Sequence, residues 1–412
     1  MVCRRGLGLE FHIRSWGGPR PRGSGRRSIF PWTSQANVRE PIPCAGPGRL
    51  SPLSASMPGT TVEAKKRVVI ELPPRGELGE AIHRHDPELE IFGSSVDLVE
   101  IDSSTVETFV AGCADADAII ATWGIRFTRP IIERLHRCVI IALASVGVDM
   151  VDIAAATDAG IVVTNVPDVF IEEVADHTLT MLLASHRRLR RMEELIGTGN
   201  WGQGWPELSR IPRLYGQTLG LISFGNVAKA VARRASAFGL HVIAYDPYVS
   251  ELKMTAEGVE PVPLHELLRR SDFVSIHAPD NAETHHMLST EQFALMKPSA
   301  VFINCGRGST VDEPALIEAL RTGQIAAAGL DVLEQEPPDP ANSLLAMDNV
   351  LLTPHVASAT SRMRPTARRR AAREVALVLS GRWPMSAVNP TVLPRTTLQR
   401  WQPHSMDRGP SR

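Results

Sequence analysis

Three charged residues that lie far apart in the sequence each follow a short apolar stretch typical of a buried strand. They are Arg307 in NCGRG, Glu336 in LDVLEQEP and His355 in LTPHVA. The carboxyl ends of strands in an open α/β sheet face the ligand crevice, so these side chains are expected to meet. A guanidinium binds a carboxylate, an imidazole moves a proton, and a carboxylate beside it orients the ring and raises its pKa. The set suits hydride transfer to a 2-oxo acid.

Each residue taken alone also has a structural interpretation. Arg307 fits a loop ion pair, Glu336 a surface acid before a proline, and His355 a packing residue at a strand end. Their occurrence at consecutive strand ends beside a nucleotide motif favours function over these alternatives.

The nucleotide motif lies in residues 220–228, GLISFGNVA. Its spacing matches the dinucleotide fingerprint, which needs a tight turn, a close backbone approach to pyrophosphate and a helix N-terminus. Gly225 keeps the middle glycine, whereas Ser223 and Ala228 replace the first and third. Asp246 ends the next strand, where its carboxylate can accept hydrogen bonds from the ribose and repel a 2′-phosphate. The motif therefore predicts NAD rather than NADP.

Short apolar runs alternate with helical stretches along most of the chain. The runs are RVVIEL (67–72), VDLVEI (96–101), DAIIAT (117–122), CVIIAL (138–143), IVVTN (161–165), LGLISF (219–224), HVIAYD (241–246), FVSIHA (273–278), AVFINC (300–305), AAAGLDV (326–332) and VLLT (350–353). Such alternation predicts an α/β fold with two doubly wound parallel sheets. One long helix is expected over residues 172–194 and a C-terminal helix over 362–380.

These elements predict a Rossmann NAD-binding domain inserted into a flavodoxin-like substrate domain. The expected boundaries are a disordered tail (1–60), a substrate-binding domain (66–165 and 356–392), a dinucleotide-binding domain (166–355) and a flexible C-terminal tail (393–412). The first tail has nine Arg, no Lys and two acids, and its composition fits an inert extension, an over-called start codon before Met57, or a transit peptide.

The composition narrows the partners. Among the 412 residues, 44 Lys and Arg balance 45 Asp and Glu, which predicts no nucleic-acid partner, and the basic stretch 362–373 is interpreted as a solvated helix face. No apolar run approaches the roughly 20 residues of a membrane span, so no membrane partner is expected. The five scattered cysteines lack C-x-x-C spacing, which predicts a reducing, cytoplasmic environment and no metal site.

Three longer stretches resemble the D-isomer-specific 2-hydroxyacid dehydrogenases, in family order and spacing over about residues 66–392. They are HAPDNAETHHMLSTEQFALMKPSAVFINCGRG (277–308), GLDVLEQEP (329–337) and NVLLTPHVASAT (349–360). The resemblance implies that Arg307 binds the substrate, that His355 gives and takes the proton, and that Glu336 supports it. It also implies a homodimer.

The resemblance implies a set of residues around the cofactor as well. They are Gly225, Asn226, Val227, Asp246, His277, Thr284, Cys305, Gly306 and Asp331. The stretch SVGVDMVD (145–152) looks like the family loop whose backbone amides, here around Val146 and Gly147, hold the substrate carboxylate.

Within the family, the combination of three segments is most similar to the branch related to the C-terminal-binding proteins. The segments are ATWGIRFT (121–128), NVPDVFIEEVADHT (165–178) and AYDPYVSE (244–251). The expected activity is NADH-dependent reduction of glyoxylate, hydroxypyruvate or a close relative. An NAD-sensing corepressor-like scaffold and a phosphoglycerate dehydrogenase without its regulatory domain stay open as alternatives, although the latter tends to carry Arg at the positions of Thr122 to Gly124.

Overall fold

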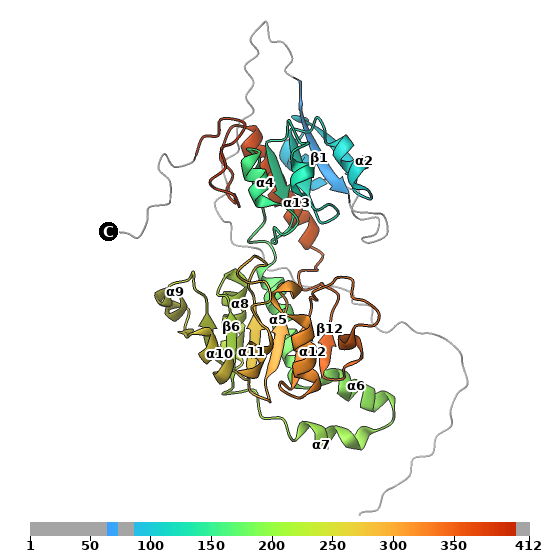
Figure 1. Cartoon of the computed structure of the whole chain (residues 1–412), viewed down its shortest axis with the longest axis vertical. Coiled ribbons are helices and arrows are strands. Elements are labelled where there is room, and N and C mark those ends of the chain that lie inside the picture. Colours follow the sequence, from blue (N-terminus) through green and yellow to red (C-terminus); the bar gives the residue numbers. More distant parts are fainter. Residues whose placement is uncertain (1–63, 73–85, 401–412) are drawn as a thin grey trace, which may run out of the picture. The chain divides into compact units, whose positions relative to one another are not determined.

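The computed structural model describes residues 64–72 and 86–400, and these residues form two parallel β-sheets with helices on their faces (Figure 1). The α/β class and the two doubly wound sheets are therefore confirmed. The predicted N-terminal tail, residues 1–60, and the last part of the predicted C-terminal tail, residues 401–412, lie outside the described residues.

The first sheet has five parallel strands in the order β2-β1-β3-β4-β5. Its strands are β1 (Lys66–Leu72), β2 (Val96–Asp102), β3 (Ala118–Ala121), β4 (Ile140–Leu143) and β5 (Val162–Thr164). Its helices are α1 (Asp86–Phe92), α2 (Val106–Gly112), α3 (Arg129–Ile132), α4 (Ile153–Asp158) and α13 (Met363–Leu379). Every residue of β3 and β4 is buried, as expected where helices cover both faces of a parallel sheet.

Helix α13 returns to the first sheet from the far end of the chain, as the sequence predicts. It packs against α1, β3 and β4, and its orange-red ribbon lies among the blue and green elements of that sheet in Figure 1. Ala367, Ala371 and Val375 form its buried stripe. The two halves of this lobe thus come from opposite ends of the described chain.

Two arginines of α13 do not lie on the solvated helix face that the sequence predicts for residues 362–373. Arg368, with only 12% of its side chain exposed, donates to both carboxylate oxygens of the buried Glu88 at 2.6 and 2.8 Å. Arg370 pairs with the buried Glu374 one turn along the helix. The expectation is therefore wrong for these residues, because their guanidinium groups pair with buried carboxylates.

The second sheet has seven parallel strands in the order β12-β11-β10-β9-β6-β7-β8. They are β6 (Thr218–Ile222), β7 (His241–Tyr245), β8 (Glu260–Pro261), β9 (Phe273–Ile276), β10 (Val301–Asn304), β11 (Ala327–Leu330) and β12 (Val350–Leu352). The helices are α5 (Ile171–His186), α6 (Leu189–Gly197), α7 (Gly204–Leu208), α8 (Asn226–Ala237), α9 (Glu251–Ala256), α10 (Leu264–Arg270), α11 (Thr290–Ala294) and α12 (Glu313–Arg321). Short 3₁₀ turns lie at Trp201–Gln203, Gly308–Thr310 and Ser343–Ala346. The two-residue strand β8 was not expected.

The long helix predicted over residues 172–194 is wrong as a single element. Helix α5 ends at His186, and α6 begins at Leu189. Arg188 between them has φ of 50°, in the left-handed region, which ends one helix before the other starts.

Alternate residues of the second sheet pack into two apolar clusters, one on each face. In β10, Ile303 packs with Leu179 of α5 and Val231 of α8, whereas Phe302 packs with Leu316 of α12. A strand buried on both faces places its polar loops at its ends, so the carboxyl ends of these strands are where a site can form.

Residues 393–400, the part of the predicted flexible tail that the structure describes, contact the first lobe. The Arg395 side chain donates to the carbonyl oxygens of Ala159 at 2.6 Å and Cys138 at 2.9 Å. The domain boundaries given above remain predictions.

Candidate active site

His355 and Glu336 form a direct pair, although 19 residues separate them in the sequence. His355 Nδ1 lies 2.7 Å from Glu336 Oε2, and the Leu333 amide donates to Glu336 Oε1 at 3.0 Å. The hydrogen bond and charge of Glu336 raise the pKa of His355. Burial opposes ionisation of Glu336, but the His355 hydrogen bond holds the pKa of that carboxyl below its ordinary value. The pair therefore favours a protonated, oriented imidazole with Nε2 left for a ligand.

The backbone of His355 is strained. Its φ of 52° lies in the left-handed region, which a residue with a Cβ adopts only when its surroundings hold it there. Its amide donates to the carbonyl oxygen of Asp331 at 2.8 Å. The next two amides, of Val356 and Ala357, donate to the Asp331 carboxylate at 2.9 and 2.8 Å. Asp331 thus fixes the turn that presents the imidazole.

Asp331 also binds a hydroxyl group from the end of β12. Thr353 Oγ1 donates to Asp331 Oδ1 at 2.6 Å and lies 3.0 Å from His177 Nε2 of α5. Asp331 is 2% exposed, so these bonds satisfy a buried carboxylate. The sequence interpretation placed Asp331 beside the cofactor and gave no role to Thr353 or His177.

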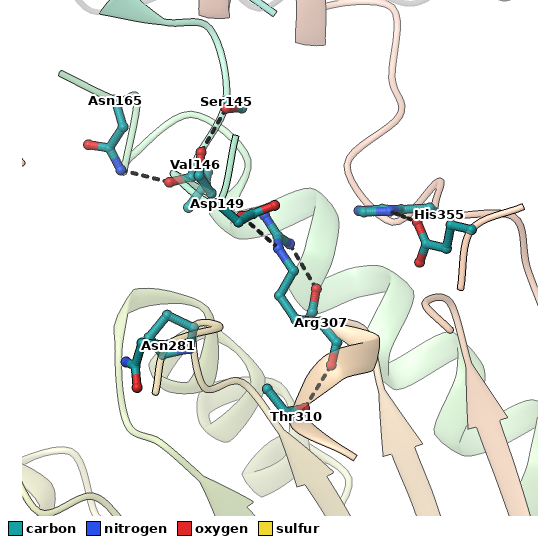
Figure 2. A network of polar contacts seen from close by, with 12 residues as sticks. Ser145, Val146, Asp149, Asn165, Asn281, Arg307, Thr310 and His355 are labelled. Atoms are coloured by element: carbon teal, nitrogen blue, oxygen red, sulfur yellow. Dashed lines mark hydrogen bonds and ion pairs between the residues drawn. The ribbon is translucent and has the colours of Figure 1, made fainter. Parts of the chain in front are cut away.

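Arg307 reaches the loop that follows β4. Its Nε donates to Asp149 Oδ1 at 3.2 Å, and its Nη1 donates to the carbonyl oxygen of Gly306 at 2.8 Å (Figure 2). A Cβ on Gly147 would overlap the Arg307 guanidinium. The glycine in SVG is therefore required for the guanidinium to lie against this loop.

The turn that carries Arg307 is held by its own strand end. The buried Asn304 accepts from the Gly306 amide at 2.9 Å and donates to the Arg307 carbonyl oxygen at 2.9 Å. A Cβ on Gly308 would collide with the backbone of Leu333. This close approach brings the Arg307 turn against the turn that leads to Glu336.

The loop after β4, which carries Ser145, Val146 and Asp149, lies beside Arg307, as Figure 2 shows. Ser145 Oγ donates to the Gly147 carbonyl oxygen at 2.8 Å, and the Asn165 side chain donates to the Val146 carbonyl oxygen at 2.7 Å. These two bonds engage the carbonyl oxygens of Gly147 and Val146 and hold the conformation of the loop.

The nucleotide motif forms the turn that its spacing predicts. Ser223, in place of the first glycine, has φ of 70°, which is the backbone conformation that favours glycine. Helix α8 begins after Gly225 with no side-chain cap, and a Cβ on Gly225 would contact nothing. An uncapped helix N-terminus with open space before it fits a pyrophosphate. The first α8 residues, Asn226 and Val227, border that space.

Asp246 lies at the end of β7, where the sequence predicts the ribose carboxylate. Its Oδ2 accepts from the Phe224 amide at 2.8 Å and lies 3.3 Å from Ser223 Oγ. Its Oδ1 accepts from the Tyr248 amide at 2.8 Å. The amides of Phe224, in the nucleotide motif, and Tyr248 therefore fix the orientation of the Asp246 carboxylate.

The remaining predicted cofactor residues lie at the ends of β9 and β10. Burial lowers the pKa of His277 to about 4, and its ring lies 3.0 Å from Ser275 Oγ. Thr284 Oγ1 donates to the Pro279 carbonyl oxygen at 2.5 Å and so closes its own loop. Burial raises the pKa of the Cys305 thiol to about 12, which makes that sulfur a poor nucleophile. Gly306 adjoins it in the Arg307 turn.

The structure thus joins Glu336 to His355 and places Arg307 against the loop of Val146 and Gly147. Sequence reasoning missed Asp149, His177, Asn304 and Thr353. Asp149 lies within the quoted stretch SVGVDMVD, but nothing in that stretch indicates that its carboxylate contacts Arg307 on the other sheet.

Other histidines and acids lie near the site without joining it. His286 Nε2 lies 2.7 Å from Glu334 Oε1, and its ring stacks on His285. Within the described ranges, three or more His, Cys, Asp or Glu are nowhere grouped so as to hold a metal ion. In the same part of the chain, every helix is too short or too polar to cross a bilayer.

Comparisons with known proteins identify the relatives of this chain. Residues 179–357 match a family model described as "D-isomer specific 2-hydroxyacid dehydrogenase, NAD binding domain". The chain is 39% identical over 280 residues to a glyoxylate reductase of Korarchaeum cryptofilum. The aligned region covers 68% of this chain and 84% of that protein. It is 36% identical over 323 residues to a D-3-phosphoglycerate dehydrogenase of Methanocaldococcus jannaschii, covering 78% of this chain but only 61% of that protein.

Solved structures show the same likeness in three dimensions. A crystal structure of an NADPH-dependent glyoxylate/hydroxypyruvate reductase from Sinorhizobium meliloti, in complex with NADP and malonate, superposes with a TM-score of 0.67 at 31% identity. The match covers 81% of this chain and 100% of the other. The similarity therefore extends well beyond the nucleotide motif.

Proposed function

Because the chain belongs to the D-isomer-specific 2-hydroxyacid dehydrogenase family, we propose that it reduces glyoxylate, hydroxypyruvate or a close relative to the D-2-hydroxy acid. It is an NAD(P)-dependent dehydrogenase that is similar to glyoxylate reductases. The observation that carries the proposal is the Glu336–His355 pair at 2.7 Å, at strand ends beside the Arg307 turn.

Each polar group of the site has a separate role in this proposal. Arg307 binds the substrate carboxylate and polarises the adjacent carbonyl group, and the amides around Val146 and Gly147 hold the same carboxylate. His355 donates a proton from Nε2 to the carbonyl oxygen as it becomes a hydroxyl. Glu336 keeps that imidazole protonated and oriented. Asp331 acts through the backbone of the turn and is a positioning residue.

The nicotinamide cofactor supplies the hydride when bound. The N-terminus of α8, with Gly225, Asn226 and Val227, would hold the pyrophosphate, and Asp246 would accept the ribose hydroxyls. His277, Thr284, Cys305, Gly306 and Asp331 would line the nicotinamide half. We propose NAD as the preferred form, because the fixed Asp246 carboxylate would repel a 2′-phosphate.

Asp246→Ala is expected to narrow the preference for NADH over NADPH by about tenfold or more, because the repelling charge is removed. The ratio of kcat/KM for the two cofactors measures this. Asp272→Ala is a matched control, since Asp272 also accepts a backbone amide, that of Thr218 at 2.9 Å, but at the opposite end of the sheet. An unchanged ratio in Asp246→Ala would contradict the role of this carboxylate.

The pH profile tests the Glu336–His355 pair. Reduction needs protonated His355, so kcat/KM for reduction should be high at low pH and fall as pH rises through the His355 pKa, which the Glu336 hydrogen bond raises above its ordinary value. Glu336→Gln removes the charge that raises this pKa, so the fall should move to lower pH. In the same variant, kcat/KM for oxidation of the hydroxy acid should rise with pH, and the midpoint of that rise should also lie at lower pH than in the wild-type protein. A profile that does not move would show that Glu336 does not set this pKa.

A panel of 2-oxo acids with NADH and NADPH, followed by absorbance at the reduced-nicotinamide band, tests the proposed function. Glyoxylate and hydroxypyruvate should be reduced, and absence of turnover with every acid would remove the proposal. The assembled Glu336–His355 pair favours turnover over a corepressor-like scaffold. The relatives compared above are glyoxylate reductases and a phosphoglycerate dehydrogenase, so the expected similarity to the branch related to the C-terminal-binding proteins is wrong. Thr122 to Gly124 carry no Arg for a phosphorylated substrate, which disfavours phosphoglycerate.

We also propose a homodimer. Trp201 and Trp205 are 80% and 84% exposed, and Leu189 and Ile196 of the neighbouring helix α6 are 55% and 63% exposed. Exposed large apolar side chains on adjoining elements are typical of a protein interface. Sedimentation velocity on the full chain tests this, and a monomer at micromolar concentration would contradict it.

We further propose a cytoplasmic location. Cys113, Cys138 and Cys305 are free thiols and buried, as is usual in a reducing compartment. Fractionation of cells that express the full chain tests this location, and recovery with an organelle would contradict it.

A further inference from the structure

Residues 385–389, which follow α13, lie along one edge of the first sheet. Strand β5 is the last strand of that sheet in the described part of the chain. Ala387 forms an antiparallel bridge with Thr164 of β5, and the Val388 amide donates to the Val163 carbonyl oxygen at 2.8 Å. The segment therefore pairs with backbone groups that an edge strand would otherwise leave open.

Two buried side chains fix this segment at its ends. Glu374 of α13, which is fully buried, accepts from the Met385 amide at 2.7 Å. Asn389, which is 3% exposed, accepts from the Val163 amide at 2.9 Å and donates to the Ile161 carbonyl oxygen at 3.0 Å. Because both ends are held, the register of the intervening residues against β5 is fixed.

That register brings Ser386 beside the residue that follows β5. One step back from Ala387 in an antiparallel pair is one step forward from Thr164, so Ser386 lies opposite Asn165. Ser386 Oγ donates to the Asn165 backbone carbonyl oxygen at 2.7 Å. The Asn165 side chain in turn donates to the Val146 carbonyl oxygen at 2.7 Å, as Figure 2 shows. Two hydrogen bonds thus lead from the C-terminal segment to the loop after β4.

The same loop carries the groups that are proposed to hold the substrate carboxylate, those around Val146 and Gly147. The Val166 amide donates to the Ser145 carbonyl oxygen at 3.0 Å, so the residue after Asn165 holds this loop as well. Movement of the Asn165 backbone would therefore move the loop through two contacts.

We propose that Ser386 and Asn165 are positioning residues through which residues 385–389 set the affinity of this loop for the 2-oxo acid. The inference rests on the proposed function, because it takes the loop of Val146 and Gly147 as the carboxylate site. Loss of either hydrogen bond lets the loop move, so the acid binds more weakly. The proposed proton transfer belongs to the other sheet and is retained.

Ser386→Ala separates binding of the acid from the chemical step. The KM for glyoxylate should rise about threefold to tenfold, because one hydrogen bond that supports the loop is lost. The kcat should stay within about twofold, as is expected when binding alone is weakened. An unchanged KM, or a fall in kcat without a rise in KM, would overturn the inference.

Two further serine variants control for this change. Ser386→Thr keeps the hydroxyl group and should have the wild-type KM. Ser380→Ala is the matched control, because the Ser380 hydroxyl also donates to a backbone carbonyl oxygen, that of Leu377 at 2.9 Å. Its KM should equal the wild-type value. The same rise in KM in Ser380→Ala as in Ser386→Ala would overturn the inference.

A double variant tests whether Ser386 acts through Asn165. Asn165→Ala removes the direct bond to Val146 and should raise the KM for glyoxylate more than Ser386→Ala does. Residues of one hydrogen-bond network have non-additive effects, so the rise in the double variant should be smaller than the product of the two single rises. A rise equal to that product would overturn the connection between the two residues.

Hydrogen exchange followed by mass spectrometry tests the loop without any acid. The amides of residues 145–149 should exchange at least threefold faster in Ser386→Ala than in the wild-type protein, because a less supported loop opens more often. They should exchange at the wild-type rate in Ser380→Ala. Equal exchange in Ser386→Ala and the wild-type protein would overturn the inference, even where glyoxylate is reduced.

Calorimetry on the NADH-loaded protein replaces the KM if no acid is reduced, with oxamate as an unreactive analogue of a 2-oxo acid. Oxamate should bind about threefold to tenfold more weakly to Ser386→Ala than to the wild-type protein, which would support the inference although the proposed function had failed. Equal affinities would overturn the inference alone. Absence of oxamate binding to the wild-type protein, together with absence of turnover, would overturn both proposals.

Discussion

Replacing His355 with alanine is expected to lower kcat/KM for 2-oxo acid reduction by about a hundredfold to ten-thousandfold, the usual contribution of a positioned general acid. Affinity for NADH should stay within about twofold, because removal of the imidazole leaves the α8 N-terminus and Asp246 in place. Steady-state kinetics and NADH fluorescence titration measure the two quantities. A parallel loss of both would show that His355 holds the cofactor instead of moving the proton.

The chain offers a matched control for this variant. His286 is also an imidazole paired with a carboxylate at 2.7 Å, and its side chain is 36% exposed compared with 47% for His355. His286→Ala should therefore remove a similar hydrogen-bonded His–Glu pair with little effect on turnover. A comparable loss of activity in His286→Ala would mean that loss of such a pair by itself disturbs the fold of this lobe.

Replacing Arg307 with alanine is expected to lower kcat/KM by about a hundredfold to a thousandfold, because charge-assisted hydrogen bonds to the substrate carboxylate are lost. The loss should include a higher KM for the acid with NADH affinity retained. Arg307→Lys keeps the charge but not the planar fork, so it should recover only part of the activity. Full activity in Arg307→Lys would contradict a bidentate contact.

Arg321→Ala controls for removal of an arginine from the same lobe. Arg321 forms an exposed pair with Glu318 on α12, at 2.8 Å, and exposed pairs contribute little stability. Its variant should retain wild-type kinetics. Both arginine variants should be compared by thermal unfolding, so that a loss of folded protein is not taken for a loss of binding.

Much of the fold could be predicted because parallel strands buried on both faces leave near-continuous apolar runs. The run FVSI, for example, is β9, and VFIN is β10. Strand β8 could not be found this way, since Glu260–Pro261 is two residues long and only partly buried. The break at Arg188 was missed for a related reason, because neither Gly nor Pro marks that left-handed residue.

The candidate site could be predicted only in part. The proposed roles of Arg307, Glu336 and His355 follow from strand ends that share one sheet edge, which a strand pattern reveals. Asp149 contacts Arg307 from a different sheet, and His177 reaches Thr353 from a helix, so both depend on packing that the sequence pattern does not encode.

The backbone contact at Gly308 and the hydrogen bonds of Asp331 bear on how relatives of this protein can come to accept different acids. These contacts hold the turns of Arg307, Glu336 and His355 against one another, and all three turns follow strands of the second sheet. The SVG loop follows β4 and belongs to the other sheet. We therefore expect substitutions in the SVG loop of the first lobe to change which acid is accepted, while the proposed proton transfer at His355, which is held by the second sheet, is retained.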